Sequence, residues 1–321
     1  MKILLGGLFL ILLSSCQSKT SDYQTITGPL TLEQAREAHQ LMVTHCYLCH
    51  SPNAPEQEGR IAPPMVAIKA HYQKETDSRE DFILGVIAYV NYPLKAVSKI
   101  PNSENRYGKM PYQQFPEGVV ENIAMYLYDY QIQEPDWFTS YWQANHGSWE
   151  QKGLILDESD TPKTHEELGL EYALSTKTLL GKNLMGAIQT KGTLAALEFC
   201  NIQAIPLTDS MSVKYNAQIK RVSDKNRNPN NAANAEELKY IQHFKNIIAK
   251  KAEPNPVVLE FENRIQFYYP ITTNTMCLQC HGKNVADDVR QQTLKLYPKD
   301  LAVDYDENEV RGIWSIQFDK K

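Results

Sequence analysis

The feature that most constrains this chain is a five-residue pattern, C-x-x-C-H, that occurs twice. It is CYLCH at 46–50 and CLQCH at 277–281. These motifs use four of the six cysteines, and Cys16 and Cys200 are the other two. Cysteines of exported proteins usually form disulfides, and a zinc site would need further paired ligands beside each motif. Two cysteines followed directly by a histidine are instead typical of covalent haem attachment.

Each motif therefore predicts one covalently bound haem c, and the chain is expected to carry two. In this chemistry the two thiols form thioethers with the porphyrin, and the adjacent histidine is placed next to the iron. The predicted residues are Cys46, Cys49, Cys277 and Cys280 for attachment, and His50 and His281 as iron ligands.

The N-terminus is predicted to be a signal peptide over residues 1–15, with an apolar run at 3–13. This run is too short for a transmembrane helix. LSSC at 13–16 resembles the bacterial lipoprotein signal, which implies a lipid anchor on Cys16 and a polar tether over 16–28. The protein is then expected on the periplasmic side of a bacterial membrane. Ordinary cleavage near Ser15, which would leave Cys16 as a free thiol, is the alternative.

Length and composition favour two folded domains. The chain has 321 residues, of which 42% are hydrophobic and 22% charged. These values are ordinary for folded soluble domains with separate cores. The formal net charge of −5 provides no large basic patch, so no nucleic-acid partner is expected.

Residues 29–131 are predicted to form a small all-α domain. Thr31 and Gln34 form a capping box before a helix that leads into the first motif, and further helices are expected near 81–90 and 117–130. The order of helix, C-x-x-C-H, loop, helix, methionine loop and helix resembles class I cytochrome c. The segments RIAPPM at 60–65 and YGKMPYQQF at 107–115 carry this resemblance.

The resemblance implies two further residues at the first haem. The carbonyl of Pro63 would accept a hydrogen bond from the second ring nitrogen of His50, and Met110 would be the sixth iron ligand. Met65 and Met125 are expected to be packing residues, since one lies in the proline loop and the other in the last helix.

Residues 132–163 form an aromatic linker with three of the four tryptophans: Trp137, Trp142 and Trp149. These rings are expected to pack the linker against one or both domains, because buried tryptophans remove a large area from water. A ligand-binding aromatic cluster is the alternative.

Residues 164–321 are predicted to form an α+β domain with long helices and an antiparallel sheet. Thr164 and Glu167 form a second capping box before a helical region that runs to about residue 204, and another helix covers 235–248. Alternation of apolar residues then predicts a hairpin at 257–269 and a final strand at 311–318.

This second domain resembles a family of exported c-type haem domains with a PAS-like fold, the DUF3365 type. The resemblance is carried by FCNIQA at 199–204, VKYNAQIKRVSDKNRNPNN at 213–231, MCLQCHG at 276–282 and RGIWSIQF at 311–318. It implies that Cys200 is the sixth haem ligand, opposite His281. A buried inert thiol is the alternative for Cys200, and the competing ligands are Met211, Met276 and His243.

The predicted function is that of a membrane-tethered dihaem electron carrier that exchanges electrons with redox partner proteins. A His/Met haem is expected to have the higher potential and a His/Cys haem the lower, because a thiolate stabilises ferric iron. A redox or gas sensor acting through a partner is the alternative. A two-haem peroxidase is a weaker one, because it needs an open iron with acid/base groups beside it, and we predict no catalytic residue.

Overall fold

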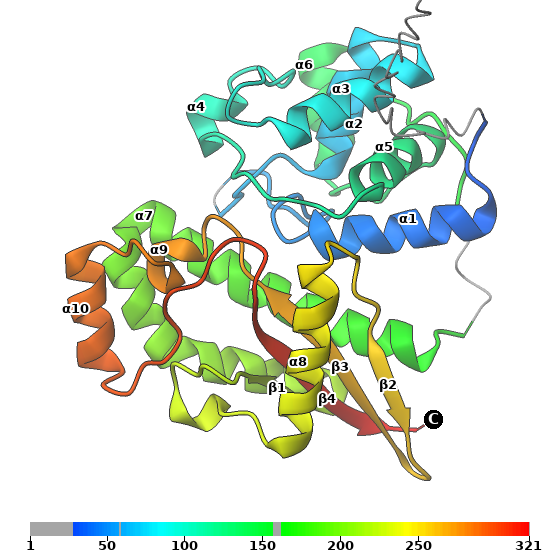
Figure 1. Ribbon diagram of the computed structural model, residues 1–321. Coiled ribbons are helices and arrows are strands. Elements are labelled where there is room, and N and C mark those ends of the chain that lie inside the picture. The colour runs from blue at the N-terminus through cyan, green and yellow to red at the C-terminus, as the bar shows by residue number, and fades with distance from the viewer. Residues whose placement is uncertain (1–27, 58, 157–161, 321) are drawn as a thin grey trace, which may run out of the picture.

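The computed structural model describes residues 28–57, 59–156 and 162–320, which form a helical N-terminal unit above a C-terminal unit built on a sheet (Figure 1). The predicted signal peptide, Cys16 and the tether up to residue 27 lie outside the described residues. Together the two units make a mixed fold with ten α-helices and four strands among the described residues.

The described residues of the N-terminal unit form six helices joined by loops. Its helices are α1 (Leu32–His45), α2 (Met65–Glu75), α3 (Arg79–Asn91), α4 (Ser103–Tyr107), α5 (Val119–Asp129) and α6 (Phe138–His146). The predicted capping box between Thr31 and Gln34 is present at the start of α1. Helix α5 packs against α1 and α3 and contributes the largest apolar face of this core.

The aromatic linker packs into the core of the N-terminal unit. Phe138 and Trp142 are buried there, and Trp137 and Trp149 cover its edge. The Trp149 indole donates to Glu134, and Leu154 pairs with Tyr130 in a short parallel bridge. The expected packing role of the tryptophans is therefore confirmed, and the part of the linker up to residue 156 belongs structurally to the first unit.

A buried cation holds this linker in place. Lys69 of α2 is fully buried, and its ammonium donates to the carbonyls of Tyr130 and Lys152. Close by, the buried Asp129 carboxylate accepts two hydrogen bonds from Arg79, both of 2.8 Å. Burial lowers the pKa of Lys69 to about 8, although the Asp129 charge acts in the opposite direction.

Replacing Lys69 with methionine is expected to lower the free energy of unfolding by about 2–4 kcal/mol, because two buried carbonyls lose their donor. The deficit should grow between about pH 8 and about pH 10. In this range the unfolded parent keeps a proton that the folded parent releases, so parent stability rises with pH. Urea unfolding at pH 7 and pH 9.5 measures both effects. Lys74→Met on the exposed face of α2 is the control. An equal loss of unfolding free energy in Lys69→Met at both pH values would contradict a lowered pKa for Lys69.

The C-terminal unit contains one antiparallel sheet in the order β1-β4-β3-β2. Its strands are β1 (Ala217–Val222), β2 (Val257–Glu260), β3 (Arg264–Thr272) and β4 (Val310–Asp319), and its helices are α7 (His165–Tyr215), the 3-10 helix η1 (Pro229–Asn231), α8 (Ala235–Ala249), α9 (Leu278–His281) and α10 (Asp287–Leu296). The predicted hairpin and final strand are confirmed as β2–β3 and β4.

The two faces of the sheet are covered by different helices. Alternate residues of β3 and β4, such as Phe267 and Ile316, pack with α7, whereas Tyr268 and Ile313 pack with Phe244 of α8. In Figure 1, α8 crosses the front of the sheet. A β-carbon on Gly169 would lie 2.2 Å from the Phe267 ring, so only glycine lets α7 approach the sheet this closely.

Helix α7 consists of two segments that meet near α9 and α10 (Figure 1). Gly192 separates them, with φ of 80° and ψ of 174°. The second segment continues past the predicted end at about residue 204, through Pro206, to Tyr215. Proline removes one helical hydrogen bond, but the buried Thr208 and Met211 beyond it keep the segment packed.

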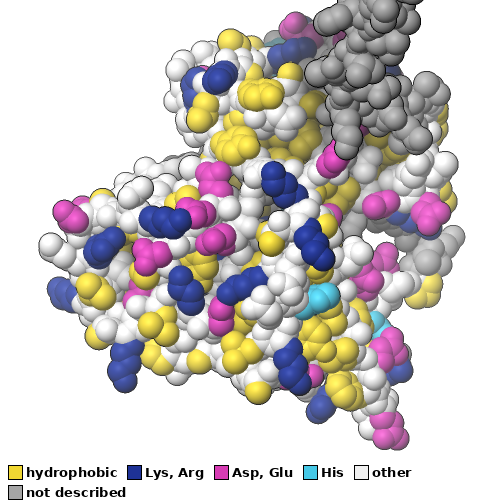
Figure 2. Space-filling model, viewed as in Figure 1, with side chains coloured by type: hydrophobic (Ala, Val, Ile, Leu, Met, Phe, Trp, Pro, Cys, Tyr) yellow, Lys and Arg dark blue, Asp and Glu magenta, His cyan; other side chains and the backbone are white. Residues whose placement is uncertain are grey.

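The two units contact each other through α1, α7 and several loops. His45 Nε2 lies 3.0 Å from Glu253, and the Thr275 hydroxyl donates to the carbonyl of Tyr112 at 2.6 Å. A β-carbon on Gly181 of α7 would lie 2.3 Å from Leu48, which sits between the first two motif cysteines. On the face in Figure 2, basic and acidic side chains are intermixed. Among the described residues, no helix has the length and apolar character needed to cross a membrane.

Candidate haem sites

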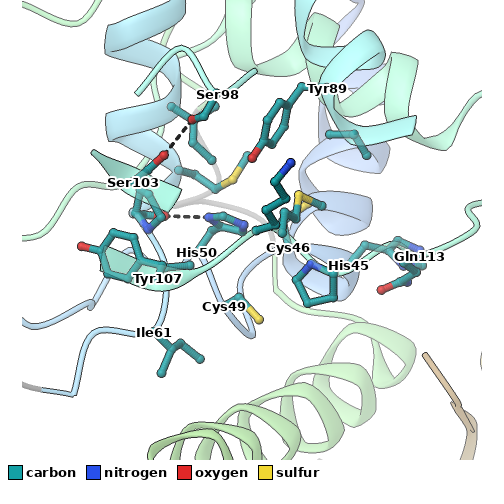
Figure 3. A pocket seen from close by; sticks show the side chains of 18 of the residues that line it. His45, Cys46, Cys49, His50, Ile61, Tyr89, Ser98, Ser103, Tyr107 and Gln113 are labelled. Carbon is teal, nitrogen blue, oxygen red and sulfur yellow. Dashed lines mark hydrogen bonds between the residues drawn. The ribbon is translucent and has the colours of Figure 1, made fainter. Parts of the chain in front are cut away.

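The first C-x-x-C-H motif forms a tight turn at the C-terminal end of α1. The Cys46 amide still bonds to Met42 of the helix, and the Cys49 and His50 amides both donate to the Cys46 carbonyl. These bonds bring Cys46, Cys49 and His50 to the wall of one cavity (Figure 3).

The His50 ring is oriented by the proline loop. Its Nδ1 lies 2.7 Å from the carbonyl oxygen of Pro63, and the His50 carbonyl accepts from the Met65 amide. Because a carbonyl can only accept, Nδ1 carries the proton, and Nε2 keeps its lone pair for a metal. The hydrogen bond that the sequence resemblance implied is thus present.

The cavity beside His50 is lined mostly by apolar side chains from α2, α3, α5 and the methionine loop. Met110 lines it, as do Met65 and, from the C-terminal unit, Met185 and Met276. Burial raises the pKa of Cys46 to about 12, raises that of Cys49 and lowers that of His50. The site therefore offers two neutral thiols, a neutral imidazole and a thioether around an apolar space, a donor set that fits haem c.

The second motif forms the short helix α9. Its His281 repeats the geometry of His50, because Nδ1 lies 2.7 Å from the carbonyl oxygen of Ala302. Burial also lowers the pKa of His281 well below its usual value. The Cys277 amide and thiol bond to Asn274 just before the motif. Nε2 of His281 is again the ring nitrogen left to bind a metal, so this site also fits haem c.

Arg227 holds the second motif and the Ala302 segment together. Its guanidinium donates to the Cys280 carbonyl at 2.6 Å and forms an ion pair with Asp300 at 3.0 Å. The side chains of Arg227 and Asp300 are 12% and 1% exposed. The neighbouring Asn226 carbonyl accepts from the Leu301 amide. These contacts give a structural role to the NRNPN stretch at 226–230, which is part of the segment that carries the family resemblance.

Cys200 lies on the second segment of α7, half-buried and near the Cys280 thiol. Burial raises its pKa, and the charges of Arg221, Arg311 and Arg227 act against this rise. The three guanidinium groups therefore offset part of the rise that burial causes in the thiol pKa. The structure thus brings Cys200 to the second site, as the sequence resemblance implied.

Three other candidate ligands for the second site have their described contacts with other parts of the protein. Met211 packs in the core between α7 and the sheet, and Met276 lines the cavity of the first site. His243 is on the exposed side of α8, where its described ring contact is with Phe244. Of the four candidates, Cys200 is the one with a described interaction with Cys280.

Sequence reasoning missed several residues at these sites. The Ala302 carbonyl carries no sequence signal, since every residue type has one. Arg221 and Arg311 look like ordinary strand residues. Lys177, a half-buried lysine that donates to Thr44 beside the first motif, lies within a long helix and had no distinguishing pattern.

Comparison with known proteins identifies the class. The model of the Tll0287-like family, described as Tll0287, matches residues 137–318, which is more than half of the chain. The chain therefore belongs to the Tll0287-like family. No curated protein matches it. A solved structure titled "Crystal structure of the cyanobacterial heme-protein Tll0287" is 21% identical, with a TM-score of 0.37, and the match covers 50% of this chain and 98% of that chain.

Proposed function

We propose that this protein is a dihaem c-type cytochrome that transfers electrons. A class I cytochrome c domain carries a His50/Met110 haem of higher potential, and a PAS-like domain carries a His281/Cys200 haem of lower potential. The observation that carries the proposal is the matched histidine geometry. In both motifs Nδ1 lies 2.7 Å from a backbone carbonyl oxygen, which leaves Nε2 for the iron.

Haem, when bound, supplies one-electron iron chemistry at each site. The paired cysteines would attach it, Pro63 and Ala302 orient the two histidines, and apolar walls would exclude water at the first site. Met110 and Cys200 are the candidate sixth ligands, and two ligands per iron suit electron transfer better than substrate turnover. Tll0287, whose name the family carries, is described as a heme-protein, and we extend haem binding to this chain.

The same proposal includes a location and partners. The lipoprotein-like signal supports attachment to a bacterial membrane through Cys16, with both haem domains in the periplasm. Electron donor and acceptor would be redox proteins of that compartment.

Two paired variants test the haem count. Intact mass and covalent-haem staining are expected to show two haems in the parent, and one each in Cys46→Ala/Cys49→Ala and Cys277→Ala/Cys280→Ala, because each motif attaches its haem independently. A parent with fewer than two haems would refute the dihaem proposal.

Ligand binding separates this proposal from the other function classes. A reduced parent that does not bind carbon monoxide and does not turn over peroxide is the expected result. Ready binding of carbon monoxide at the second haem would favour a sensor, and peroxide turnover with a simple electron donor would favour an enzyme.

A further inference from the structure

One lysine lies at the junction of the two candidate haem sites. Lys177 is on the first segment of α7, half-buried where this helix meets the N-terminal unit. Its Nζ is 3.3 Å from the carbonyl oxygen of Thr44, two residues before Cys46. A helix of the C-terminal unit thereby places a cation against the first attachment motif.

The groups that interact electrostatically with Lys177 come from both sites. Its electrostatic partners are, in decreasing order, Cys277, Cys49, Glu253 and Cys46. Burial lowers the pKa of Lys177, and these four groups raise it. One partner belongs to the second motif and two belong to the first, so the ammonium lies between the two motifs.

The two sites also share a wall. Asn274 and Met276, directly before the second motif, line the cavity beside His50. Thr275 between them donates to the carbonyl of Tyr112, two residues after Met110. The segment directly before the second motif therefore lies against the first site, so a charge placed between the two motifs acts on both sites.

Haem attachment would leave one ionisable acid among the electrostatic partners of Lys177. The motif thiols become thioethers, which cannot ionise, so Glu253 remains as the anionic partner among those named above. Ferric iron carries one positive charge more than ferrous iron. A nearby ammonium therefore repels the ferric state more strongly and favours uptake of an electron.

We propose that Lys177 is a cation shared by the two haem sites, where its ammonium raises the reduction potential of both. The inference deepens the proposed function and rests on it, since both motifs must carry haem. Lys177 would change the two potentials through the electrostatic field of its charge, and not by binding iron.

Redox titration of the full-length dihaem protein tests this role. Lys177→Met is expected to shift the reduction equilibria of both haems toward the ferric state, each by roughly tenfold, which is about 59 mV for a one-electron couple. Lys177→Arg keeps the charge and should stay close to the parent. Lys182→Met, on the exposed face of the same helix, is the matched control and should change neither potential.

The Glu253→Gln variant is expected to shift the reduction potentials in the direction opposite to Lys177→Met. Removing this carboxylate is expected to raise both potentials, which a general loosening of the interface would not do selectively. A shift of only one haem in Lys177→Met, of neither, or of equal size in Lys182→Met would overturn the inference. Intact mass of every variant is measured first, because loss of a haem would count against the proposed function instead.

Discussion

Replacing Cys200 with alanine is expected to remove one of two low-spin ferric EPR signals, the one with the narrow g-spread of thiolate ligation. The potential of the second haem should rise on the order of 100 mV or more, within the ~0.8 V range that axial ligands span. The reason is charge, because an iron-bound thiolate stabilises ferric iron, and three arginines near Cys200 act against the rise that burial causes in its pKa. Low-temperature EPR and redox titration of the oxidised protein measure both changes.

A neighbour on the same turn of α7 supplies the control. Ile202 is 64% exposed, so Ile202→Ala should leave both signals and both potentials unchanged. The first haem should also be unaffected by Cys200→Ala, since its predicted ligands lie in the other unit. A high-spin signal in the unmodified protein would show an open iron and count against ligation by Cys200.

Replacing Arg227 with leucine is expected to lower the free energy of unfolding of the C-terminal unit by about 3–5 kcal/mol. The variant leaves Asp300 buried without its partner and the Cys280 carbonyl without its 2.6 Å donor. The Ala302 segment that orients His281 should loosen as well. Urea unfolding followed by the far-UV signal measures the stability, and the absorption spectrum of the second haem reports the histidine.

Arg290 on the exposed side of α10 is a matched control, because Arg290→Leu makes the same change in chemistry without a buried partner. Its effect on stability should stay within about 0.5 kcal/mol. An Arg227→Leu protein as stable as this control would show that the ion pair with Asp300 contributes nothing net.

The parts of the structure that follow local patterns could be predicted from the sequence. The capping boxes at Thr31 and Thr164 begin α1 and α7, and the alternation in β3 and β4 places Phe267 and Ile316 on one face. The hydrogen bond between His50 and Pro63 joins residues only 13 positions apart, within a loop of familiar sequence.

Features that depend on distant partners could not be predicted. Helix α2 was missed because Lys69 occupies a core position, where the pattern needs an apolar residue and where only remote carbonyls make a cation acceptable. Strand β1 was missed because its sequence, AQIKRV, is half polar. Arg227 lies 53 positions from Cys280 and 73 from Asp300, so the sequence carried no sign of their contact.

The break at Gly192 divides α7 into two segments, and each segment contacts a different candidate haem site. One segment carries Lys177 and Gly181 against the N-terminal unit, and the other carries Cys200 to the second motif. The φ angle of 80° at Gly192 suits glycine, and a residue with a side chain would be strained there by about 1–2 kcal/mol. In the proposed dihaem protein, this bend would help to set the spacing of the two haems. A change in the bend would then alter this spacing, and with it the proposed rate of electron exchange, while every candidate iron ligand stays the same.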